Sequence, residues 1–65
     1  MPIVNIQQFP RSLEQRRELA QRITTAFVEV YGASAESVQV FFTEVESDHW
    51  AKAGVLGCDR ETNQS

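Results

Sequence analysis

The apolar residues of this chain form three groups, and each group has its own spacing. The first group, PIVNIQQF, is rich in β-branched residues and ends before Pro10, a composition that predicts a β-strand over Pro2–Phe9. In the second group, apolar side chains recur at steps of three and four, with charged residues on much of the remaining circumference. This period predicts an amphipathic α-helix over residues 13–31.

Both ends of the predicted helix carry the sequence signals of helix caps. Ser12 begins the sequence SLEQ, in which Gln15 stands three residues after a candidate N-cap serine. This spacing is typical of a capping box, in which the two residues satisfy each other's backbone N–H groups. At the other end, Gly32 supplies the left-handed conformation that commonly stops a helix.

The third apolar group, VQVFFTEV, predicts a second strand over Val38–Val45. Val40 and Phe42 point to one face of this strand and Phe41 to the other, because successive side chains in a strand alternate. Apolar residues on both faces are typical of a parallel strand that is covered on both sides. One long helix connects the two predicted strands, which gives a β-α-β unit.

The residues after Val45 predict a polar turn, a short hairpin near Val55–Leu56 and a polar tail that begins DRET. The expected fold class is therefore α+β, a single β-α-β unit with two parallel strands, one long helix and a short C-terminal hairpin. We expect the domain to cover residues 1–58 and the tail to cover residues 59–65.

One helix covers only one face of a two-stranded sheet, and the sequence predicts no second helix. A chain of 65 residues buries only ~60% of the surface of its unfolded form, so small domains gain stability from disulfides, a metal or oligomerisation. The one cysteine, Cys58, cannot form an internal disulfide, and the one histidine, His49, makes no metal cluster. We therefore expect a homo-oligomer in which another copy covers the second face.

The charge and hydropathy of the chain exclude two classes of partner. The formal net charge is −3, and the longest basic run is the Arg16–Arg17 pair, whereas a nucleic-acid-binding domain presents a basic face. No run approaches the ~18 apolar residues of a membrane helix, and the N-terminus lacks the apolar region of a signal peptide. Together with the free thiol, these features predict a cytoplasmic protein.

Pro2 is the candidate catalytic residue. Cytosolic processing removes an initiator methionine readily when the next residue is small, and removal would leave Pro2 with a secondary amine. An α-amino group has a pKa of ~7.7–8.0, proline's amine lies somewhat higher, and burial or nearby cations lower it. A base near neutral pH suits general acid–base catalysis. The structural alternative is that Met1 is retained and Pro2 only begins an edge strand.

Three other side chains are candidates for substrate binding. Arg11, just ahead of the helix, either holds a carboxylate in a bidentate grip or is a solvated surface arginine. Gln39, which points away from its apolar neighbours, either donates to a ligand oxygen or pairs at a strand edge. Trp50 either roofs an apolar pocket or packs in a subunit interface. His49 is expected in an exposed turn, and Cys58 has no activating neighbour.

The segments PIVNIQ, RSLEQRRELAQRIT, SVQVFFTEV and HW, taken in order, resemble the 4-oxalocrotonate tautomerase family over roughly residues 2–58. The resemblance implies a protomer that assembles into dimers or hexamers with sites at subunit contacts, and a role in aromatic compound degradation. It implies that Pro2 moves a proton between an enol oxygen and a carbon of a conjugated 2-oxo acid, without cofactor or metal. It further implies that Arg11 binds the substrate carboxylate, Gln39 orients the carbonyl oxygen and Trp50 keeps the site apolar.

The chain departs from the family's pattern at two places. Gln39 replaces a strand arginine that polarises the carbonyl, and a neutral amide stabilises a developing enolate less than a guanidinium does. The stretch between Pro2 and Arg11 is also one residue shorter, with FPR where a glycine usually precedes the arginine.

Three hypotheses about the function result. The first is a tautomerase, an isomerase that acts on a small carboxylate-bearing acid. The second is a hydratase, dehalogenase or decarboxylase that acts on a three-carbon acid. The third is a non-catalytic oligomeric module.

Overall fold

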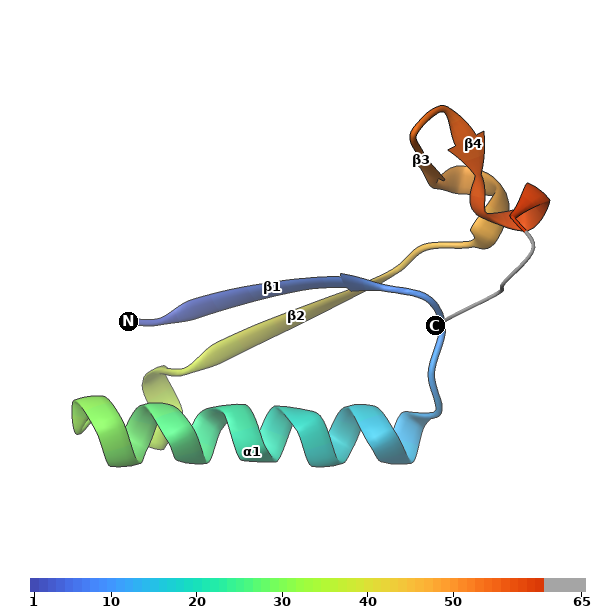
Figure 1. The fold of residues 1–65 in the computed structure, drawn as a ribbon. Helices are drawn as coiled ribbons and strands as arrows, with labels where there is room; N and C mark the ends of the chain where they lie inside the picture. Colours follow the sequence, from blue (N-terminus) through green and yellow to red (C-terminus); the bar gives the residue numbers. More distant parts are fainter. Residues whose placement is uncertain (61–65) are drawn as a thin grey trace.

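The computed structural model describes residues 1–60 of the chain as a β-α-β unit followed by a small hairpin (Figure 1). Short 3-10 turns connect these elements after the helix and on either side of the hairpin. The elements, in chain order, are β1 (Ile3–Gln8), α1 (Leu13–Tyr31), β2 (Gln39–Glu44), β3 (Ala51–Lys52) and β4 (Val55–Leu56). The predicted fold class is confirmed.

Helix α1 begins and ends at the residues that its cap signals predict. The Ser12 hydroxyl accepts a hydrogen bond from the Gln15 backbone N–H at 3.1 Å, and the Gln15 side-chain oxygen accepts one from the Ser12 N–H at 3.4 Å. This is the reciprocal pattern of a capping box. At the other end Gly32 has φ 70° and donates its N–H to the carbonyl of Val28 at 3.0 Å. Glycine adopts this left-handed conformation without the steric cost of a Cβ.

Strands β1 and β2 are parallel neighbours, and α1 lies along one face of the sheet that they form (Figure 1). Val4 pairs with Val40 and Ile6 with Phe42 in the register of the two strands, and these four side chains are half-buried. An ion pair between Arg16 of α1 and the carboxylate of Glu44, at 3.5 Å, joins the helix to the same face. The two predicted strands and their parallel pairing are confirmed.

The opposite face of the sheet, which we call the open face, is not covered by any element within residues 1–60 (Figure 1). About half of the Phe41 side chain is exposed (51%), and Ile3 is equally exposed (52%). The open face consists of the alternate residues of the two strands, Ile3, Asn5, Gln7, Gln39, Phe41 and Thr43. It therefore presents two large apolar side chains among polar ones to solvent.

A single chain has no hydrophobic core in the part that the structure describes. Among residues 1–60, no apolar side chain reaches full burial, and Gly57 is the one buried residue. Burial of apolar surface is the main favourable contribution to folding. A lone β-α-β unit of this kind is therefore marginal, and covering the open face would supply the missing burial.

The hairpin β3–β4 projects beyond the end of β2, away from α1 (Figure 1). Its strands are antiparallel, with Ala51 opposite Leu56 and Lys52 opposite Val55. The two turn residues, Ala53 and Gly54, both have positive φ, 55° and 80°, as the favoured two-residue hairpin turns require. The predicted hairpin is confirmed, whereas most of the predicted tail, residues 61–65, lies outside the described residues.

Candidate active site

The four predicted site residues lie in two groups at opposite ends of the sheet. Pro2 and Gln39 lie at the amino ends of β1 and β2, where the Pro2 carbonyl accepts a hydrogen bond from the Gln39 N–H at 3.0 Å. Arg11 and Trp50 follow the carboxyl ends of the same strands. Because β1 has six residues and a strand rises ~3.3 Å per residue, the two ends are about 20 Å apart. One small acid cannot contact both groups of a single chain.

At the amino end, Pro2 is half-buried and precedes the first residue of β1. The side chain of Gln39 belongs to the open face, as do its neighbours Ile3 and Phe41. Its carboxamide can donate a hydrogen bond but carries no charge. This end therefore combines the candidate base with a neutral donor and an exposed apolar surface.

At the carboxyl end, a shallow pocket of about 290 Å³ lies between the end of β1 and the first turns of α1. Arg11 lies at its edge and donates from Nε to the side-chain oxygen of Gln15 at 3.2 Å. The side-chain nitrogen of Gln8 is buried and has no hydrogen-bond partner within the described residues. The lining consists of Gln8, Phe9, Arg11, Gln15, Arg16 and Leu19. The guanidinium of Arg11 and the unpaired amide donor of Gln8 make this pocket suited to an anion, whereas Arg16 is already paired with Glu44.

Trp50 is held next to this pocket by contacts on several sides. The Trp50 indole and the Phe9 ring form a T-shaped pair, with an interplanar angle of 86° and ring centroids 5.5 Å apart, a favourable aromatic geometry. The guanidinium of Arg60 lies 5.9 Å from the indole centroid, within the range of a cation–π contact. Gly57 donates its N–H to the Trp50 carbonyl at 2.7 Å. A Cβ at Gly57 would come within 2.9 Å of the indole and of the Ser47 carbonyl, so glycine allows this close approach.

Three residues of the carboxyl end were not among the sequence candidates. Gln8 and Phe9 belong to the predicted first strand, and their alternation gave no sign that they line a pocket. Arg60 falls in a polar stretch that resembles a tail. The one available signal for Arg60 was its position ten residues after Trp50, and this spacing does not by itself indicate a contact between the two side chains.

His49 and Cys58 lie outside both groups. His49 is exposed in a short 3-10 turn, 3.8 Å from the Asp48 carboxylate, as expected from the sequence. Cys58 is a free, exposed thiol. No group of three potential metal ligands occurs within residues 1–60. In the same residues, no helix combines the length and hydropathy that a membrane span needs.

The fold and the two groups of side chains define a small β-α-β protein with an amino-proximal proline and an anion-suited pocket at the other end of its sheet. A family model described as tautomerase enzyme matches residues 2–60. The chain is 40% identical over 62 residues to 2-hydroxymuconate tautomerase of Bacillus subtilis (strain 168), a match that covers 94% of this chain and 100% of that protein. The chain therefore belongs to the tautomerase family, whose named members are isomerases.

Solved structures of this family have the same fold. A 4-oxalocrotonate tautomerase homologue superposes with a TM-score of 0.85 at 35% identity, covering 95% of this chain and 100% of its own. A heterohexamer 4-oxalocrotonate tautomerase from Chloroflexus aurantiacus J-10-fl superposes with a TM-score of 0.82 at 27% identity, covering 91% of this chain and 97% of its own. The second neighbour is thus an oligomer. The family resemblance predicted from the sequence is confirmed.

Proposed function

We propose that this protein is a cofactor-independent tautomerase that interconverts the enol and keto forms of a small unsaturated 2-oxo acid. The observation that carries the proposal is the 40% identity to 2-hydroxymuconate tautomerase over that protein's whole length. Two further findings support it. The family match begins at Pro2, and Pro2 lies at the amino end of β1, where its carbonyl accepts a hydrogen bond from the backbone N–H of Gln39.

The chemistry follows from the nitrogen of Pro2. Removal of Met1 turns this nitrogen from an amide into a secondary amine with a lone pair. The amine takes the proton of the enol hydroxyl, the electron pair shifts through the conjugated system, and the ammonium returns the proton to a carbon. The proline ring restricts φ and holds the amine in place. A base held within reach of both atoms suits general acid–base catalysis.

The other roles require more than one copy of the chain. Since the two ends of β1 are about 20 Å apart, Pro2 and Gln39 of one chain act together with Arg11 and Trp50 of a neighbouring chain. Arg11 holds the substrate carboxylate, Gln39 donates to the carbonyl oxygen, and Trp50 keeps the site apolar. The same assembly, a dimer or hexamer, would cover the open face that leaves Phe41 half exposed.

The direct test is turnover by the purified protein, with Met1 removed, of 2-hydroxymuconate and of phenylenolpyruvate. The enol and keto forms of each acid have different ultraviolet absorption spectra. The decay of the enol absorbance therefore gives the rate of conversion. We expect catalysis of at least one enol in the presence of a metal chelator. Decay at the uncatalysed rate for both enols would contradict the proposal.

The neutral side chain of Gln39 favours a second candidate function. In this function the protein is a hydratase, dehalogenase or decarboxylase that acts on a three-carbon acid through a protonated Pro2. A neutral amide stabilises an enolate less than an arginine does, and these reactions need an acid more than a base. Incubation with a 3-haloacrylate and with malonate semialdehyde separates the two functions. Release of halide or carbon dioxide at a higher kcat/KM than enol conversion would favour this second candidate.

A further inference from the structure

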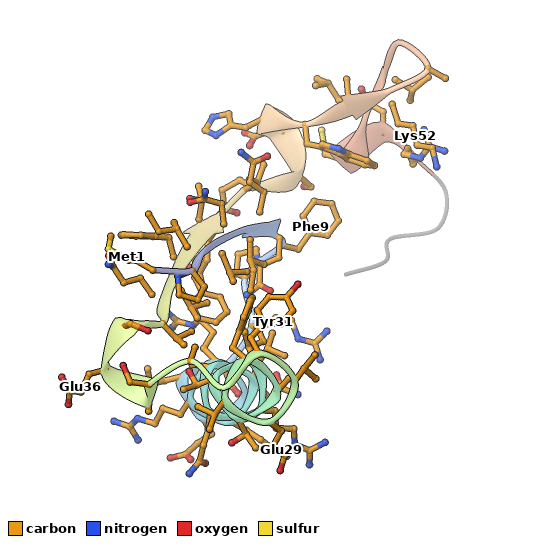
Figure 2. All side chains as sticks on the ribbon, turned by 90° about the vertical axis from the view of Figure 1, so that its left-hand side faces the viewer. Met1, Phe9, Glu29, Tyr31, Glu36 and Lys52 are labelled. Atoms are coloured by element: carbon orange, nitrogen blue, oxygen red, sulfur yellow. The ribbon has the colours of Figure 1, made fainter. Side chains whose placement is uncertain are left out.

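Arg11 lies in the connection between β1 and α1, outside any helix or strand, and its side chain is exposed. The connection runs from the end of the sheet to the first turn of α1 (Figure 1). In Figure 2, Phe9 lies on the side of the sheet where the hairpin carrying Lys52 is found, and α1 lies on the other side. A long side chain loses rotamer entropy when a ligand fixes it. Arg11 therefore binds a ligand more tightly if a protein group fixes it beforehand.

The side-chain oxygen of Gln15 is such a group, and the capping box holds it in place. This oxygen, Oε1, accepts a hydrogen bond from Nε of Arg11 at 3.2 Å. The same oxygen accepts hydrogen bonds from the backbone N–H of Ser12 at 3.4 Å and from the Ser12 hydroxyl at 3.3 Å. The backbone N–H of Gln15 donates to the Ser12 hydroxyl at 3.1 Å. Gln15 thus offers Arg11 an acceptor that is fixed to the first turn of α1.

The chemistry of this contact suits an arginine that binds an anion. Both residues line the pocket of about 290 Å³ at the carboxyl end of the sheet. A guanidinium is a planar fork, so a hydrogen bond at Nε fixes the direction of its two terminal nitrogens. Arg22 of the same helix bonds instead to the carboxylate of Glu18, also four residues away. The amide of Gln15 carries no charge, so it orients the guanidinium of Arg11 without offsetting the positive charge that attracts an anion.

We propose that Gln15 is a positioning residue, whose side-chain oxygen orients the guanidinium of Arg11 so that the terminal nitrogens bind the substrate carboxylate. The glutamine that closes the capping box thereby also increases the affinity of the site for its ligand. This inference rests on the proposed function for the role of Arg11, but its test measures binding and does not require turnover.

The test is a binding titration that uses the only tryptophan of the sequence, Trp50, as its probe. The ligands are sorbate, a six-carbon diene with one carboxylate, and sorbamide, in which an uncharged amide replaces that carboxylate. The change in Trp50 emission gives a Kd for each ligand and protein. The variants are Gln15→Leu, Gln15→Glu, Arg11→Gln and the double variant of Arg11→Gln with Gln15→Leu. The matched control is Ser12→Ala, which removes the capping hydroxyl and keeps the oxygen of Gln15.

We expect the wild-type protein to bind sorbate more tightly than sorbamide, and Gln15→Leu to weaken sorbate binding about 3- to 10-fold with little change for sorbamide. Gln15→Glu keeps the capping box, and its carboxylate offsets the charge of Arg11, so it should weaken sorbate binding without unfolding the helix. Ser12→Ala should retain the preference for sorbate. An unchanged preference in both Gln15 variants would overturn the inference.

The double variant tests whether Gln15 acts through Arg11. Once Arg11 is replaced by glutamine, Gln15→Leu should cause no further loss of sorbate binding, because two residues that act as a unit are not additive. A further loss in the double variant, or an equal loss of sorbate and sorbamide in Gln15→Leu, would indicate a structural role of Gln15 and would overturn the inference.

The two proposals fail in different ways. If the wild-type protein shows the Gln15-dependent preference but converts no enol, the proposed function is wrong and the positioning role remains. If Arg11→Gln abolishes the preference and Gln15→Leu does not, only the positioning role is wrong. If Arg11→Gln leaves the preference unchanged, Arg11 does not bind the carboxylate, and both its proposed role and the positioning role of Gln15 are wrong.

Discussion

Replacement of Pro2 by alanine is expected to lower kcat/KM for enol conversion by about 100-fold or more, because general acid–base catalysis contributes ~10²- to 10⁴-fold. Alanine is also small, so Met1 is still removed and a primary amine remains. The primary amine of alanine is not part of a ring, so its lone pair is not held in one direction. Water also solvates it better than it solvates the secondary amine of proline. The loss should therefore lie toward the lower end of the range. Initial rates with phenylenolpyruvate measure it.

A second substitution at the same position separates the amine from the side chain. Leucine is large, so Pro2→Leu should retain Met1 and leave an amide nitrogen with no basicity. We expect this variant to lose more activity than Pro2→Ala, with both circular dichroism spectra unchanged. Ile3→Val, one position along the strand, serves as the control and should remain active. Turnover by Pro2→Leu at the wild-type rate would show that the base lies elsewhere.

Replacement of Phe41 by aspartate is expected to dissociate the oligomer and to unfold much of the resulting monomer. Phe41 is half exposed on the open face of a single chain, and its full burial would contribute ~1.5–3 kcal/mol per chain. An unpaired carboxylate at the same place would cost several kcal/mol more. Because no apolar side chain within residues 1–60 is buried in the isolated chain, the monomer has little else to stabilise it.

Light scattering after size-exclusion chromatography, together with far-ultraviolet circular dichroism, measures both effects of Phe41→Asp. Enzymatic activity should disappear as well, because Pro2 and Arg11 then no longer meet in one site. Thr25→Asp, on the exposed outer side of α1, is the matched control and should keep the native mass and spectrum. A folded, active Phe41→Asp protein of native mass would show that the open face is not the interface.

The secondary structure of this protein could be predicted because its signals are local. Ser12 and Gln15 form their capping box within one turn, and Gly32 stops the helix through its own backbone preference. The parallel pairing of β1 and β2 follows from the long helix between them. The open face was also predictable, since Phe41 alternates with the residues that α1 covers.

The candidate site could be predicted only in part. The sequence offered Pro2, Arg11, Gln39 and Trp50 as candidates, and the family resemblance predicts their roles. No local pattern, however, shows which residues a hairpin brings together. The contacts of Trp50 with Phe9 and Arg60 depend on the path of the chain after β2. Arg60 was assigned to a polar tail because its neighbours are polar, and its contact with the indole appears only in the structure.

The intact mass of the native protein decides whether Pro2 can act as the base. Catalysis by Pro2 requires a free amine, and a free amine requires the loss of Met1. We predict the mass of the chain without its initiator methionine. A native protein that retains Met1 and still converts enols faster than the uncatalysed rate would contradict the assignment of Pro2 as the base. The nitrogen of Pro2 would then be an amide, which cannot carry a proton.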